Sequence, residues 1–211
     1  MSDFSNLTIG VLALQGAFIE HVKMLKRLGA TAREVRLPSD LDGLDGLIVP
    51  GGESTTIGKL LVSYELLEPL RGLVSSGFPI YGTCAGTILL AKDIGGLDQP
   101  LLAKMDLVVE RNAFGRQLQS FETDIQINGL GDEPFRAIFI RAPAITSVGP
   151  TVEALAQLEN GTIVAAREGS LLVSCFHPEL TNDDRFHRSF LELVRAHHAA
   201  ASPIGSAIPA R

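Results

Sequence analysis

The sequence predicts a single α/β domain with a mainly parallel sheet, and three observations lead to this fold class. The chain has 211 residues, a length that suits one hydrophobic core. Short apolar runs, typical of strands covered on both faces, alternate with segments whose apolar residues recur at helical spacing. Hydrophobic residues make up 45% of the chain and charged residues 20%, a composition that excludes disordered and fibrous proteins.

The first half of the chain shows a repeated strand–helix–strand pattern. Buried strands are predicted at 7–14, 31–36, 46–49 and 77–81. Helices are predicted at 18–28, 55–73 and 87–92. Gly29 is placed to end the first helix. The second helix is expected to break near Glu68-Pro69, because proline cannot donate the hydrogen bond that a helix interior requires.

The second half changes character. Strands with few helical residues between them are predicted at 107–110, 121–127 and 137–140, which indicates an antiparallel excursion. Segments 162–166 and 171–176 are expected to form a hairpin. The last helix is expected to have Asp183 and Asp184 in its first turn and an inner stripe of Phe186, Phe190, Leu193 and Val194. Residues 199–211 are small and include proline, so we expect a disordered tail after a domain of residues 1–198.

Charge and cysteine content restrict the protein class further. The formal charge of −6 disfavours a partner with many phosphates, such as nucleic acid or an anionic membrane. Two cysteines cannot build a disulfide framework, which indicates a reducing compartment. The N-terminus lacks the pattern of a secretory signal, and no apolar run reaches the length that a membrane span needs. These features predict a cytoplasmic protein.

The sharpest local signal is the turn Gly82-Thr83-Cys84-Ala85-Gly86 between a predicted strand and a predicted helix. This context matches a nucleophile elbow, in which flanking glycines permit a strained turn that exposes the nucleophile. The start of a helix favours the Cys84 thiolate, and the backbone N–H of Ala85 can face a developing oxyanion. The alternative is a buried structural cysteine between two turn glycines.

A thiol nucleophile needs a base, and His177 is the best candidate. It follows an apolar strand, and Glu179 can lie on the same side of the extended chain and orient the imidazole ring. Because parallel strands end at one edge of a sheet, Cys84 and His177 can meet there. The alternative is a histidine and a glutamate that cap a strand at the surface.

Pro50-Gly51-Gly52-Glu53-Ser54 follows another buried strand. Adjacent glycines expose backbone N–H groups, and these groups can supply the rest of an oxyanion hole. A plain turn remains an alternative. A phosphate-binding loop is the other alternative, but the segment does not match the Walker pattern. One residue too many separates Gly52 from Gly58, and Leu60 stands where Ser or Thr is required.

The remaining polar signals are weaker. Segments 109–117 and 140–143 carry arginines, which either hold a substrate carboxylate or lie solvated at the surface. The other histidines lack partners at metal-ligand spacing, so no metal and no cofactor is predicted. Cys175 lies inside an apolar strand and is expected to pack there.

Together these segments resemble the glutaminase subunit of pyridoxal 5'-phosphate (PLP) synthase, the PdxT/SNO family of class I, triad-type glutamine amidotransferases. The resemblance runs from about Leu7 to His198. Gly-x-Cys-x-Gly and His177-Pro178-Glu179 mark the broad class, and the segments at 51–54 and 111–117 narrow it to this family. The resemblance implies a three-layer, flavodoxin-like α/β/α domain.

The resemblance also implies which residues form the active site. Cys84 would be the nucleophile, His177 the acid and base, and Glu179 its orienter. The residues implied to line the glutamine site are Gly52, Glu53, Ser54, Arg111, Ile140 and Arg141. Gln15 would lie near the oxyanion loop formed by Gly52 and Ala85.

The resemblance implies L-glutamine as substrate and a PLP synthase subunit as partner, with no nucleic acid or membrane involved. One alternative is a glutaminase of another amidotransferase, such as the imidazole glycerol phosphate synthase subunit, which should differ at 111–117. A second is a catalytically silent regulatory module. The intact Cys84, His177 and Glu179 argue against a silent module.

Overall fold

The computed structural model describes residues 4–111, 113 and 120–201, and the account below concerns these residues. The elements of the N-terminal half are β1 (Thr8–Leu12), α1 (Phe18–Arg27), β2 (Thr31–Val35), a 3-10 helix η1 (Pro38–Leu41), β3 (Gly46–Val49), α2 (Ser54–Ser63), α3 (Leu67–Ser75), β4 (Ile80–Thr83), α4 (Ala85–Leu90) and β5 (Ala91–Asp93). Those that follow are β6 (Met105–Glu110), β7 (Ser120–Ile125), β8 (Phe135–Ile140), β9 (Ala144–Val148), β10 (Glu153–Gln157), β11 (Ile163–Glu168), β12 (Leu171–Ser174), a 3-10 helix η2 (Pro178–Leu180) and α5 (Arg185–Ala201).

One large mixed sheet forms the centre of the molecule, with strand order β2-β1-β3-β4-β12-β11-β9-β6-β5 and β10 on β11. The first five strands of this order are parallel. Strands β12, β11, β9 and β6 then pair antiparallel, and β7 and β8 form a separate antiparallel pair. The order of the parallel half is that of a flavodoxin-like sheet, with β12 as the fifth strand. The parallel half, the antiparallel excursion and the β11–β12 hairpin are all confirmed.

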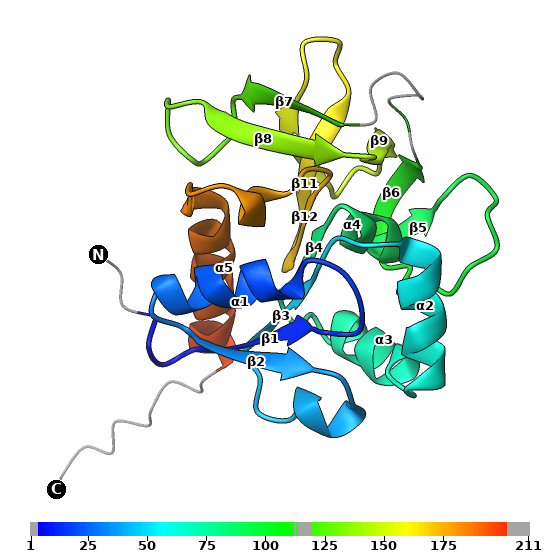
Figure 1. Cartoon of the computed structure of the whole chain (residues 1–211), viewed down its shortest axis with the longest axis vertical. Helices are drawn as coiled ribbons and strands as arrows, with labels where there is room; N and C mark the ends of the chain where they lie inside the picture. Colours follow the sequence, from blue (N-terminus) through cyan, green and yellow to red (C-terminus); the bar gives the residue numbers. More distant parts are fainter. Residues whose placement is uncertain (1–3, 112, 114–119, 202–211) are drawn as a thin grey trace, which may run out of the picture.

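Helices cover both faces of the parallel half, which gives the three layers. Side chains of β4 alternate between the faces. Tyr81 packs against Phe186 and Phe190 of α5, with ring centroids 5.4 and 5.6 Å apart. The next residue, Gly82, lies against Gly86 of α4. Figure 1 shows α1 and α5 on one side of the sheet and α2, α3 and α4 on the other.

This topology determines where a site can form. Strands β1, β3, β4 and β12 lie side by side and run in the same direction, so their carboxyl ends meet at one edge. The segments that follow these four strands contain Gln15, Gly52, Cys84 and His177. All four predicted segments are therefore brought to one edge of the sheet.

Some predicted boundaries were wrong. The helical segment predicted at 55–73 breaks at Tyr64 to Leu66, where Glu65 adopts φ 57°, and not at Pro69. Pro69 is the third residue of α3, where no intrahelical N–H bond is required, so proline is tolerated there. Helix α4 spans Ala85–Leu90, two residues earlier than predicted at each end, and residues 91–92, which were predicted to be helical, belong to strand β5. Strands β9 and β10 were not predicted at all.

The last helix also differs in detail. Asp183 and Asp184 precede α5, and Asp183 Oδ1 accepts a hydrogen bond from the backbone N–H of Arg185 at 3.0 Å. Leu193 is only partly buried, whereas Leu191 is fully buried beside the rest of the stripe. Helix α5 continues to Ala201, three residues into the expected tail, and residues 202–211 lie outside the described part of the chain.

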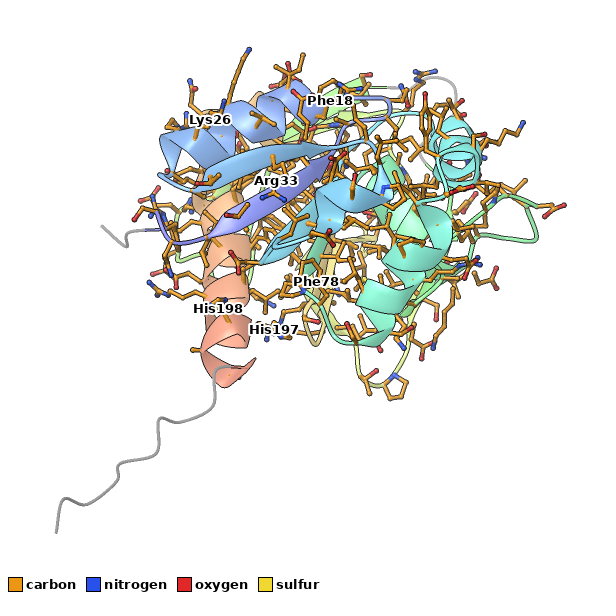
Figure 2. All side chains as sticks on the ribbon, turned by 90° about the horizontal axis from the view of Figure 1, so that it is seen from below. Phe18, Lys26, Arg33, Phe78, His197 and His198 are labelled. Carbon is orange, nitrogen blue, oxygen red and sulfur yellow. The ribbon has the colours of Figure 1, made fainter. Side chains whose placement is uncertain are left out.

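The C-terminal histidines lie away from the edge where the predicted segments meet. Figure 2 shows His197 and His198 near the C-terminal end of α5. His198 Nδ1 lies 3.1 Å from Oδ1 of Asp45, the residue before β3, so this end of the helix packs at the amino edge of the strands. Within the described ranges, no helix combines the length and the apolar character that crossing a bilayer requires.

Candidate active site

Cys84 lies in a strained turn between β4 and α4. Its backbone adopts φ 48° and ψ −100°, a conformation that L residues rarely adopt. The backbone N–H of Cys84 donates to the carbonyl of Ser174 on β12 at 2.7 Å, and the Thr87 hydroxyl donates to the same carbonyl at 2.8 Å. The neighbouring strand therefore holds the turn from outside, and the predicted elbow geometry is present.

His177 reaches the same edge from β12. Its backbone N–H donates to the carbonyl of Ile138 on β8 at 2.8 Å. Gly51 lies against both His177 and Cys84: a Cβ at Gly51 would be 2.4 Å from His177 Cε1 and 3.3 Å from Cys84 Cβ. The imidazole and the thiol thus share one small space.

Glu179 completes the arrangement from η2. Its Oε1 lies 2.6 Å from His177 Nδ1, and its side chain is fully buried. Burial disfavours the imidazolium, but the interactions of His177 with Glu179 and Cys84 outweigh it and raise the pKa of His177 to about 10. His177 is therefore protonated at neutral pH, a state that suits a thiolate beside it.

The loop after β3 is held by the loop after β1. The backbone N–H of Ala17 donates to the carbonyl of Gly51 at 3.1 Å, and Gln15 Oε1 accepts from the backbone N–H of Glu53 at 2.8 Å. Gly16 adopts φ 99°, and a Cβ there would lie 1.8 Å from the Gly51 carbonyl oxygen. Because a trans peptide directs its C=O and N–H to opposite sides, these contacts determine where the Gly52 N–H points.

A cavity of about 350 Å³ opens over Cys84. Its size suits a small metabolite. The residues predicted to form the site that line it are Gln15, Gly52, Glu53, Ser54, Cys84, Arg111, Ile140, Arg141 and His177. Glu179 lies behind His177, and Ala85 follows Cys84 at the start of α4. The predicted residues are therefore all brought together.

A polar network holds Arg111 at one wall of the cavity. Arg111 Nη2 donates to Glu53 Oε1 at 3.1 Å, and Nη1 donates to Thr55 Oγ1 and Gln99 Oε1 at 3.2 Å each. Arg111 is thus oriented by three side chains before any ligand arrives. The rest of the predicted motif, residues 112 and 114–117, lies outside the described residues.

Glu53 caps a helix besides lining the cavity. Its carboxylate accepts hydrogen bonds from the backbone N–H groups of Thr55 and Thr56 at 3.2 and 2.7 Å and so caps α2. Burial opposes ionisation, but the bonds from Thr56 and Thr55 outweigh it and lower the pKa of Glu53 to about 2. Glu53 is therefore ionised at neutral pH.

Sequence reasoning missed several residues of this site. Ala17, Ile88 and Leu180 also line the cavity, and Gln99 reaches the Arg111 network from the loop after β5. Ala17 follows the recognised Gln15 closely, which is a usable signal. No local pattern marks Gln99, because its role depends on contacts with α2 and with Arg111.

Two other predictions concern cysteine and metal sites. Cys175 is fully buried and unpaired, and burial raises the pKa of its thiol, so this cysteine is unreactive and packs as predicted. Among the described residues, no group of three or more His, Cys, Asp or Glu side chains is positioned to hold a metal ion.

Comparison with known proteins agrees with this geometry. The sequence profile described as the SNO glutamine amidotransferase family matches residues 11–196. A relative from Herpetosiphon aurantiacus, named pyridoxal 5'-phosphate synthase subunit PdxT, is 60% identical over 190 residues, which cover 89% of this chain and 100% of that protein. A relative of the same name from Roseiflexus sp. is 56% identical over 189 residues, again 89% of this chain and 100% of that protein.

A crystal structure described as a glutamine amidotransferase superposes with a TM-score of 0.84 at 53% identity, covering 89% of this chain and 98% of that one. The family profile spans the four segments that meet at the edge of the parallel strands. This chain belongs to the SNO glutamine amidotransferase family.

Proposed function

We propose that this chain hydrolyses L-glutamine to L-glutamate and ammonia and delivers the ammonia to a PLP synthase subunit. One observation carries the proposal: the strained Cys84 lies beside an imidazole whose far nitrogen is 2.6 Å from the buried carboxylate of Glu179. Nucleophile, acid–base group and orienting group therefore follow one another in a line.

In the first half of the reaction, the Cys84 thiolate attacks the side-chain carboxamide carbon of glutamine. A C–S bond forms, and the carbonyl electron pair moves onto oxygen. When the tetrahedral intermediate collapses, the C–N bond breaks and His177 gives its proton to the leaving nitrogen. Ammonia and a γ-glutamyl thioester result.

Water completes the turnover. His177, now neutral, accepts a proton from water while the oxygen attacks the thioester carbon. The C–S bond then breaks, which releases glutamate and restores the thiolate beside a protonated His177. Glu179 holds the imidazole in the same orientation through both steps.

Two backbone N–H groups are proposed to hold the oxyanion, those of Gly52 and Ala85. Losing one such donor typically costs about 3 kcal/mol of transition-state stabilisation. The orientation of the Gly51–Gly52 peptide is therefore a point of control. Because Ala17 and Gln15 hold this loop, a partner that moves the loop after β1 would change the activity.

The charged walls of the cavity suit the amino-acid end of glutamine. Arg111 and Arg141 line the cavity and can bind the α-carboxylate, and the ionised Glu53 can attract the α-ammonium group. Ser54 and Ile140 would complete the contacts with the substrate. This orientation directs the carboxamide toward Cys84.

The proposed partner follows from the chemistry and from the named relatives. Ammonia at neutral pH is mostly ammonium, a poor nucleophile, so a glutaminase is most useful when it passes ammonia directly to a second site. The relatives from Herpetosiphon and Roseiflexus are named as PLP synthase subunits, which favours this partner over imidazole glycerol phosphate synthase. We place the activity in the domain of residues 1–198 and in the cytoplasm, where a free thiol remains reduced.

The test measures glutamate release from glutamine by wild type and Cys84→Ala, each with and without the PLP synthase subunit. Wild type should be slow alone and faster with the synthase, and Cys84→Ala should be inactive in both cases. A glutamine-analogue alkylator should label wild type and Cys175→Ala but not Cys84→Ala. Wild-type rates in Cys84→Ala would refute the nucleophile, and failure of the analogue to label wild type with the synthase present would support a silent module.

A further inference from the structure

Two buried histidines lie behind the proposed triad. His21 of α1 and His187 of α5 are both fully buried. His21 Nδ1 lies 2.8 Å from His187 Nε2, and His21 Nε2 lies 3.2 Å from Thr83 Oγ1 and 3.6 Å from Glu179 Oε2. A continuous polar row therefore runs from Glu179 into the layer between α1 and α5.

The Glu179 carboxylate needs an N–H donor or a positive charge on the side that faces His21. Its Oε1 is occupied by His177, but its Oε2 is buried and makes no hydrogen bond within the described residues. A buried carboxylate oxygen without a hydrogen bond destabilises the folded protein unless a positive charge or an N–H group faces it. His21 Nε2 is in that position, at the distance of an electrostatic contact.

Two proton arrangements are possible for the histidine pair, and two observations distinguish them. If His21 carried its proton on Nδ1, the lone pair of Nε2 would face the negative Glu179 Oε2. His187 Nδ1, which has no partner within the described residues, would then be a buried N–H without an acceptor. If both histidines carry their proton on Nε2, His187 donates to His21, and the N–H of His21 faces Thr83 and Glu179. The second arrangement avoids both penalties.

We infer that His21 is a positioning residue for the triad: its Nε2–H faces Glu179 Oε2, and His187 holds it in that tautomer. Glu179 is then fixed from both sides, by His177 on one oxygen and by His21 on the other. This inference rests on the proposed role of Glu179 as the orienter of His177.

The surroundings keep His21 neutral, as this role requires. Burial, together with the charges of His187 and His177, lowers the pKa of His21 well below its usual value. Burial, together with the charge of Arg27, lowers the pKa of His187 to about 3. The titratable groups that face His21 are Tyr81 of β4, Glu179 of η2, His177 just before η2, and His187 of α5. Arg27 of α1 is the charged group that acts on His187. Glu179 carries the only carboxyl group of this set, and the row supplies a neutral N–H donor to it.

The first test reads the tautomers directly. Full-length protein labelled with 15N-histidine is examined by long-range 1H–15N correlation at neutral pH. His21 and His187 should both appear as neutral rings protonated on Nε2. A ring of His21 protonated on Nδ1, or on both nitrogens, would overturn the inference.

The second test uses kinetics with the PLP synthase subunit present. His21→Leu removes the donor and should lower kcat by about tenfold with little change in KM. The acidic limb of the pH profile of kcat/KM should move to higher pH in His21→Leu, because a buried carboxylate without this N–H donor protonates more readily. His21→Gln, whose amide nitrogen can take the place of Nε2, should restore most of kcat and the wild-type limb.

A matched control separates positioning from packing. Leu25→Ala creates a cavity on the same helix and should lower thermal stability without moving the acidic limb. If His21→Leu keeps the wild-type limb while wild type is active, this inference alone fails. If wild type releases no glutamate with the synthase present, the proposed function fails, whatever the tautomers show.

Discussion

Gly86 of α4 lies directly against the carbonyl of Val49 at the end of β3. A Cβ at position 86 would be 2.1 Å from that carbonyl oxygen, which is far closer than any real contact. The helix that follows Cys84 is thus packed onto the strand that precedes the oxyanion loop. The second glycine of the elbow is required by this approach of two elements and not by its own backbone angle.

Gly86→Ala should therefore destabilise the protein, because backbone on both sides leaves no room to relax. We expect a loss of about 1–3 kcal/mol in the free energy of unfolding, measured by urea denaturation. Gly72→Ala is the matched control. Gly72 lies within α3 with nothing near its missing Cβ, so alanine should stabilise it by about 0.5–1 kcal/mol. Equal effects of the two substitutions would contradict the packing argument.

The ion pair around His177 makes stability depend on pH in a defined direction. The pKa of His177 is raised from 6.5 to about 10 in the folded protein, so its stabilising contribution is fully present below pH 6.5 and is lost as pH rises toward 10. The difference in unfolding free energy between wild type and His177→Gln should shrink between pH 6.5 and 10. A difference that stays constant or grows across this range would show that the imidazole is not protonated in the folded state.

His187 acts in the opposite direction. The pKa of His187 is lowered from 6.5 to about 3 in the folded protein. Below pH 6.5 the unfolded chain therefore binds a proton at this histidine, whereas the folded protein binds it only near pH 3. Wild type should lose stability as pH falls through this range. His187→Leu should show a flatter dependence in urea denaturation between pH 6.5 and 4, even if its stability at neutral pH is lower. A slope equal to that of wild type would contradict the buried neutral ring.

Gln99 should influence substrate binding without touching the chemistry. Its Oε1 accepts hydrogen bonds from Ser54 Oγ, Thr55 Oγ1 and Arg111 Nη1 at 3.3, 3.0 and 3.2 Å. Gln99→Leu removes the acceptor that these three donors share and leaves Arg111 held by Glu53 and Thr55 alone, so KM for glutamine should rise by about tenfold with kcat nearly unchanged. Gln126→Leu, on the surface, is the control and should leave KM unchanged. A fall in kcat alone would show that Gln99 acts on the triad instead.

Gln15 should determine the activity through the oxyanion loop. Gln15→Ala removes the acceptor for the Glu53 N–H and should lower kcat by about tenfold with the synthase present. Gln15→Glu keeps an acceptor oxygen and should retain more activity than the alanine variant. If both variants match wild type, the contact does not orient the loop during catalysis.

Local pattern was enough to locate most of the elements and the residues of the site. The apolar runs of β1, β3, β4 and β12 identify buried strands, and the residues at their ends carry the reactive groups. The glycines on either side of Cys84 mark the elbow in the sequence. In the fold, both are needed because neighbouring backbone lies too close for a Cβ atom. Parallel strands also imply a shared edge, so the meeting of Cys84 and His177 followed from topology.

What the pattern missed depends on contacts between distant segments. Strand β10, with the sequence Glu-Ala-Leu-Ala-Gln, has no strong strand signal and forms because β11 offers it an antiparallel edge. The break between α2 and α3 occurs at Glu65 and not at the proline, because Pro69 fits the first turn of a helix.

The same holds for the inner part of the site. His21 and His187 are 166 residues apart in sequence, and Gln99 is 12 residues from Arg111 but lies in an irregular loop. The burial and the hydrogen-bond partners of such side chains depend on how the layers pack. They cannot be predicted from the spacing of residues along the sequence. The chain alone determined the strands that carry the site, the turns after them and the identity of the reactive groups, and only the tertiary structure decided which side chains from distant segments support them.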